Sequence, residues 1–129
     1  MHPGFQLCAP FLQHLLLGRR LAPPAYLGLA REVELAQGTL EEVADPARFQ
    51  VVSLSNIFDW SDDGLVVAWA RHLRALRPGS AVLIRQLNNA RDVAPAFAPD
   101  FAFDAALGDE LQRRDRSLFY ERVLVGVRS

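Results

Sequence analysis

Polar side chains suited to chemistry follow directly after a buried apolar run in the middle of the chain. The run Phe49 to Leu54 is rich in β-branched residues, which is typical of a buried strand, and Ser55, Asn56, Asp59 and Trp60 come next. Ligands of open α/β sheets bind at the carboxyl ends of the parallel strands. A hydroxyl, an amide, a carboxylate and an indole at such an end could hold a polar ligand and stack a flat or cationic one. The alternative is that Asn56 and Asp59 form hydrogen bonds with backbone groups of the turn and that the indole of Trp60 packs in the core.

A guanidinium stands at the end of a second apolar run, Ala81 to Ile84. A buried arginine requires a polar or charged partner. Arg85 could therefore hold a ligand carboxylate through two parallel hydrogen bonds, or it could pair with an aspartate as part of the scaffold. Asn88, Asn89 and Arg91 follow at the same predicted edge.

A third polar group, Asp115 to Ser117, precedes the last predicted strand and is expected in the same crevice. Asp115 is one of three aspartates that could neutralise Arg85, the others being Asp59 and Asp92. Alternatively, Asp115 ends the preceding helix. Arg116 supplies a second guanidinium, a group whose planar fork matches a carboxylate.

Strands and helices alternate along the chain and would position these groups. Ser61 is the expected N-cap of the clearest helix, and Pro78 is its stop. We predict strands over 33–36, 49–54, 81–86 and 117–127, a helix after Ser61 and another over 104–113, one helical turn over 40–43, and a loop over 90–103. Residues 1–28 are expected to hold a helix over 5–17 and a proline-rich connector over 21–26. This order predicts a single α/β domain with a mostly parallel sheet, helices on its faces and a C-terminal antiparallel strand.

Composition excludes several classes of function. The 14 basic and 15 acidic side chains are mixed along the 129 residues and give a formal charge of −1, so a nucleic-acid partner is not expected. All the basic side chains counted here are arginine, which excludes a lysine Schiff base and a P-loop lysine. The single cysteine and the three histidines lack a metal-ligand spacing, and we expect no metal site.

The same sequence predicts a cytoplasmic location. One cysteine permits no internal disulfide, which fits a reducing compartment. No signal-peptide pattern and no run of about 18 apolar residues is present. The apolar face of the predicted helix over 5–17 leaves peripheral membrane contact as an alternative to core packing.

Three ordered runs resemble a known enzyme family. They are Leu54 to Trp60, Leu83 to Arg91 and Asp115 to Arg122, preceded by similar short runs between Pro10 and Leu27. Together they resemble the diacylglycerol 3-amino-3-carboxypropyltransferases, which begin bacterial betaine-lipid synthesis, and the resemblance covers most of the chain. It implies a partial Rossmann-like, class I methyltransferase-like fold that uses S-adenosylmethionine. The transferred group would be aminocarboxypropyl, the acceptor a diacylglycerol hydroxyl and the released product methylthioadenosine.

The resemblance also implies roles for individual residues. Asp59 would accept the proton of the attacking hydroxyl or orient it, and Tyr120 is a second candidate for proton transfer. Candidate cofactor contacts are Gly38, Thr39, Ser55, Asn56, Trp60, Arg85 and Arg116, and candidate substrate contacts are Asn88, Asn89, Arg91, Asp115 and Ser117.

Half of the family's cofactor site is missing from this sequence. None of the eight glycines forms Gly-x-Gly, and Gly38 is followed by Thr39 where such folds often place an aspartate. We therefore expect this chain, which corresponds to the C-terminal half of the transferase, to bind S-adenosylmethionine weakly or not at all by itself. Its partner would be a chain with a glycine-rich loop, or a second copy paired at an exposed strand edge. The alternatives are a non-catalytic binding or assembly module and a related methyltransferase.

Overall fold

The computed structural model describes residues 34–87, 91–115 and 119–129. The chain divides into two units at residue 35, and all the described helices and strands belong to the second unit, Ala36–Ser129. The helix predicted over 5–17 and the connector over 21–26 lie outside the described residues. None of the helices formed by the described residues has the length and apolar character needed to cross a membrane.

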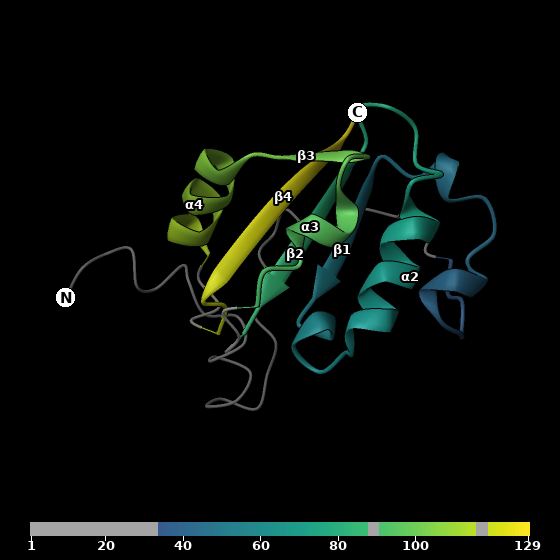
Figure 1. Cartoon of the computed structure of the whole chain (residues 1–129), viewed down its shortest axis with the longest axis horizontal. Coiled ribbons are helices and arrows are strands. Elements are labelled where there is room, and N and C mark those ends of the chain that lie inside the picture. The colour runs from purple at the N-terminus through teal and green to yellow at the C-terminus, as the bar shows by residue number, and fades with distance from the viewer. Residues whose placement is uncertain (1–33, 88–90, 116–118) are drawn as a thin grey trace, which may run out of the picture. The chain divides into compact units, whose positions relative to one another are not determined.

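A four-stranded sheet with the order β1-β2-β4-β3 forms the centre of this unit (Figure 1). The strands are β1 (Val51–Ser55), β2 (Ala81–Gln86), β3 (Phe101–Phe103) and β4 (Arg122–Arg128). β1 and β2 pair in parallel, whereas β4 pairs antiparallel with both β2 and β3. The α/β class and the antiparallel C-terminal strand are confirmed. The sheet is mixed and not mostly parallel in its pairing, because β4 lies between β2 and β3.

The strand predicted over 33–36 is wrong for the residues that can be checked. Glu34, Leu35 and Ala36 form no strand, and Leu35 is 90% exposed. An exposed segment gains too little from burial to offset the entropy lost when a strand is ordered. Two short 3-10 turns, η3 (Leu40–Glu42) and η4 (Pro46–Arg48), precede β1 instead. The turn predicted over 40–43 is confirmed, and β1 forms an edge of the described sheet.

The helix predicted after Ser61 is α2 (Asp63–Leu73), but its cap differs from the prediction. The carboxylate of Asp62 accepts the N–H of Leu65 at 2.8 Å and caps the helix. The hydroxyl of Ser61 donates instead to the carbonyl of Ile57 at 2.7 Å. Ser61 is therefore engaged by the preceding turn η5 (Ile57–Asp59), and the next residue takes its expected place.

The loop predicted over 90–103 is also wrong, because it contains α3 (Ala94–Phe97) and β3. Pro95 lies in the first turn of α3, where no backbone N–H is needed. The ring of Phe97 is buried and meets the rings of Phe58, Phe101 and Phe103 edge-on. Tertiary burial of these rings stabilises elements that are too short for a periodic pattern.

Helices cover both faces of the sheet. One face carries the main core, which α2 and α3 complete, and includes Leu54, Phe58, Val82 and Ile84. The other face is covered in part by α4 (Ala105–Arg114), which matches the helix predicted near 104–113. A Cβ on Gly108 would lie 2.5 Å from the carbonyl oxygen of Val123, so α4 approaches β4 closely at a glycine.

Candidate functional site

A tight turn at the end of β1 brings its polar residues over the neighbouring strand. Asn56 has a φ of 46°, a left-handed conformation that asparagine tolerates better than most residues. Its N–H donates to the carbonyl of Arg85 at 2.7 Å, and its carbonyl accepts the N–H of Asp59 at 3.3 Å. The turn therefore ties the end of β1 to the end of β2.

Phe58 anchors this turn in the core. Its side chain is 1% exposed, and its ring lies 5.8 Å from the ring of Trp69 and 6.1 Å from that of Phe97. With Phe58 held inward, the flanking side chain of Trp60 projects outward and is 81% exposed. Trp60 is consequently not the core residue that the sequence allowed as an alternative.

Asp59 lies across the carboxyl ends of both parallel strands. Its Oδ2 accepts the backbone N–H of Leu87 at 3.0 Å, just after β2 ends. Its Oδ1 is buried and has no hydrogen-bond partner among the described residues. A buried carboxylate oxygen without a donor is costly, so this atom is suited to accept a hydrogen bond from a ligand.

Arg85 projects from β2 toward Ser53 and Tyr120. Its Nη2 lies 3.4 Å from the Ser53 hydroxyl, and its guanidinium carbon lies 5.2 Å from the centre of the Tyr120 ring. Its Nε is buried without a partner, and no ion pair joins it to a carboxylate of the described part of the chain. None of the three predicted aspartates therefore neutralises Arg85, and Asp92 instead lies 3.9 Å from Arg122.

A cavity of about 240 Å³ adjoins this guanidinium. Arg85, Arg114 and Asp115 supply its polar wall, and the other lining residues are Leu83, Leu111 and Val123. Asp115 also takes the C-terminal cap position of α4, which is the alternative role that the sequence left open. The structure thus brings Arg85 and Asp115 to one cavity, and the ring of Tyr120 lies against Arg85.

The sequence alone did not single out Gln86 or Ser53. The side chain of Gln86 is fully buried, with Nε2 donating to the carbonyl of Arg91 at 2.9 Å and Oε1 lacking a partner among the described residues. The sequence signal for Gln86 was an amide at an inward-facing position of β2, in the alternating series Val82, Ile84 and Gln86. Ser53 alternates with the buried Leu54, which places its hydroxyl on the same face as Arg85.

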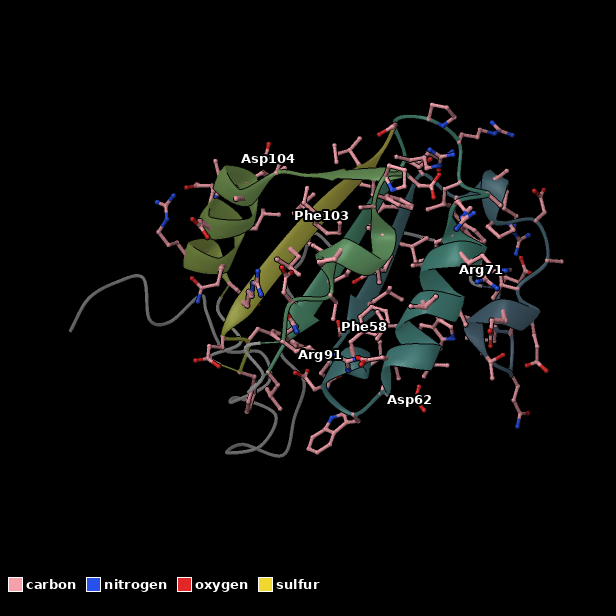
Figure 2. All side chains as sticks on the ribbon, in the orientation of Figure 1. Phe58, Asp62, Arg71, Arg91, Phe103 and Asp104 are labelled. Carbon is pink, nitrogen blue, oxygen red and sulfur yellow. The ribbon has the colours of Figure 1, made fainter. Side chains whose placement is uncertain are left out.

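Arg91 lies apart from the Arg85 cavity and holds the turn together. Its Nη1 donates to the carbonyl of Ser61 at 2.6 Å and to that of Phe58 at 3.5 Å, while Nη2 pairs with Asp63. Figure 2 shows Arg91 beside Phe58, near the start of α2 at Asp62. These contacts give Arg91 a scaffold role next to the site.

Gly38 and Thr39 are not joined to these groups. Gly38 and Thr39 do not follow a strand. The Thr39 N–H instead donates to the Glu42 carboxylate at 2.6 Å, next to η3. A Cβ on Gly38 would lie 2.3 Å from the same carboxylate, so both residues serve this turn. Four further candidates lie outside the described residues, namely Asn88, Asn89, Arg116 and Ser117.

Comparisons of the chain with protein-family models, with curated proteins and with solved structures find no match.

Proposed function

We propose that this chain supplies the acceptor-side half of an S-adenosylmethionine-dependent transferase that moves a 3-amino-3-carboxypropyl group to a diacylglycerol hydroxyl. The carboxylate of Asp59 carries the proposal. One oxygen is fixed by the Leu87 N–H at the carboxyl ends of β1 and β2, and the other is buried without a partner among the described residues. This is where open α/β sheets bind their ligands.

The strand directions support a class I methyltransferase-like half. β1, β2 and β3 run in one direction, and the last strand is inserted against them between β2 and β3. Sheets of that class end in the same way, with an antiparallel last strand between the fifth and sixth strands. β1 and β2 would then correspond to the fourth and fifth strands.

The groups around Arg85 suit one end of the cofactor. Its unpartnered Nε and the adjoining cavity of about 240 Å³ fit a carboxylate, which a guanidinium binds through two parallel hydrogen bonds. Asp59 Oδ1 suits an amino group or a hydroxyl as donor. When bound, S-adenosylmethionine supplies an electrophilic aminocarboxypropyl carbon next to its sulfonium. The ribose and adenine contacts would have to come from a glycine-rich loop that this sequence lacks.

Asp59 would accept the proton of the attacking hydroxyl. Its fixed position limits the orientations of that hydroxyl, which lowers the entropic cost of alignment. Ser55 ends β1 and Asn56 follows it, and both would orient the same oxygen or the amino-acid end of the cofactor. Tyr120 would steady Arg85 through its ring.

A non-catalytic binding module is the second candidate. The observation that favours it is the clamp formed by Arg91 and Asp59 on the turn over 57–63, since such contacts also occur in a purely structural scaffold. The two candidates differ in what they require of Asp59. A transferase needs the carboxylate for turnover, so Asp59→Asn should abolish its activity and leave the fold intact, whereas a binding module has no turnover to lose.

S-adenosylmethionine that carries an isotope label at one of two positions tests the proposed transferase activity directly. The chain is co-expressed with the coding sequence adjacent to it and supplied with dispersed diacylglycerol and S-adenosylmethionine labelled either in the aminocarboxypropyl carbons or in the methyl group. Label from the aminocarboxypropyl carbons is expected in the lipid fraction. Methyl label in that fraction would indicate a methyltransferase, and no label in lipid from either cofactor would favour the binding module.

A further inference from the structure

Three exposed apolar side chains lie around the site at the carboxyl edge of the sheet. The exposed fraction is 81% for Trp60, 63% for Phe119 and 37% for Ile57. Large apolar groups that are exposed together often mark an interaction surface, whereas single ones need no explanation.

A series of contacts places these side chains along one edge. Trp60 follows Asp59, whose carboxylate accepts the Leu87 N–H directly after β2. The carbonyl of Gln86 accepts the Glu121 N–H at 2.9 Å, just before β4, and Phe119 lies two residues earlier. β2 separates β1 from β4, so the patch spans about two strand spacings, or roughly 10 Å.

The exposure of Trp60 follows from the structure of the turn. Phe58 occupies the core position of η5, which leaves Ile57 and Trp60 to point outward. An indole combines an apolar ring with one N–H donor, and for this reason tryptophan concentrates where an apolar phase meets water.

Among the described residues at this edge, two arginines each lie beside an aspartate. Arg91 pairs with Asp63, and Arg122 lies 3.9 Å from Asp92. Glu121 is exposed, and the whole chain contains no lysine. Anionic lipid surfaces are recognised by clusters of basic side chains. Because these arginines are paired with aspartates, this edge is better suited to a lipid surface without net charge.

We propose that the carboxyl edge, defined here by Ile57, Trp60 and Phe119, docks onto an electrically neutral lipid surface. Trp60 enters the interface, which brings Asp59, the adjacent residue, within reach of a hydroxyl at the level of the headgroups. The inference deepens the proposed function, on which it rests only for the identity of the lipid acceptor.

Trp60 fluorescence tests the docking without any cofactor. In Trp69→Phe, Trp60 is the only tryptophan of the chain. Addition of dioleoylphosphatidylcholine vesicles should move its emission to shorter wavelength. In flotation, Trp60→Ser and Ile57→Ser should each bind less, and loss of the tryptophan should reduce partitioning by about tenfold or more. Val127→Ser is the matched control, since Val127 is also 37% exposed but pairs with Ala81 at the opposite edge.

Three outcomes would overturn the proposal. The first is an unchanged Trp60 emission with neutral vesicles, and the second is binding only to vesicles that contain anionic phosphatidylglycerol. The third is self-association without vesicles that Trp60→Ser abolishes, which would make the edge a contact between copies. Transfer of the aminocarboxypropyl group to a detergent-dispersed short-chain diacylglycerol needs no vesicle. This transfer therefore tests the proposed function separately from the docking.

Discussion

The carboxylate of Asp59 accepts a hydrogen bond from the backbone N–H of Leu87, 28 positions further along the chain, at 3.0 Å. This contact joins the turn after β1 to the end of β2. It also leaves Oδ1 buried without a partner among the described residues. One carboxylate thus fastens two strand ends and offers an acceptor at the edge where the ligand would bind.

Replacement of Asp59 separates its structural role from its chemical role. In Asp59→Asn, an amide oxygen still accepts the Leu87 N–H, so the melting temperature should stay nearly unchanged. Asp59→Ala removes that acceptor and should lower the free energy of unfolding by about 1–3 kcal/mol. Thermal and urea unfolding measure both variants, and equal losses in the two would contradict this division.

The anchoring of the turn by Phe58 predicts a large loss of stability on truncation. Phe58→Ala removes a ring that is 1% exposed and packs against two other aromatic rings, so the free energy of unfolding should fall by about 3–5 kcal/mol. Val67→Ala on α2, where the side chain is 45% exposed, is the control and should change it by less than about 0.5 kcal/mol. Similar effects of both changes in urea unfolding would argue against the anchor.

The position of β1 at an edge of the described sheet predicts self-association. The Ala81 N–H donates to the Gln50 carbonyl, and the parallel register then directs the backbone groups of Val52 toward β2 and those of Val51 away from it. Val51→Pro should therefore keep the fold and weaken association, by about fivefold for one lost hydrogen bond. Val52→Pro is the matched control and should unfold the sheet. A wild-type chain that is monomeric by light scattering at high micromolar concentration would refute the prediction.

The missing glycine-rich loop predicts weak binding of the cofactor by this chain alone. The glycine loop and the acidic residue after the second strand supply most of the backbone donors and the ribose contact in such folds, so the dissociation constant should be on the order of 1 mM or weaker. Isothermal titration with S-adenosylmethionine measures it. Micromolar binding by the isolated chain would mean that the described residues hold far more of the cofactor than Arg85 and Asp59 can account for.

Sequence patterns predicted the long elements well but placed several of their ends wrongly: α2 ends at Leu73 and not near Pro78, and β4 begins at Arg122. The buried run over 81–86 is β2 in full, and the helix after Ser61 and the C-terminal strand are both present. These segments have enough residues for a periodic pattern to be unambiguous. α3 and β3 were missed because each has only three or four residues and is stabilised by rings from elsewhere, chiefly Phe58 against Phe97.

The candidate site was predictable in part. The carboxyl ends of adjacent parallel strands lie at the same edge of a sheet. Asp59 and Arg85 could therefore be assigned to one edge from the strands that precede them. The contacts that define each group could not be foreseen. The Asp59 contact depends on the left-handed turn at Asn56, and the Arg85 contacts depend on the register between β1, β2 and β4. The exposure of Trp60 likewise follows from the burial of Phe58, which only the packing reveals.

The rate of methylthioadenosine formation by Asp59→Asn tests the central claim most directly. The variant and the wild-type chain are each co-expressed with the adjacent coding sequence and assayed with S-adenosylmethionine and diacylglycerol, beside Asp100→Asn as a control in the ion pairs of the opposite edge. We predict a loss of at least about a hundredfold for Asp59→Asn, as expected for a general base, with an unchanged melting temperature and full activity in the control. Wild-type turnover by Asp59→Asn, or no methylthioadenosine from the wild-type assembly, would contradict the assignment.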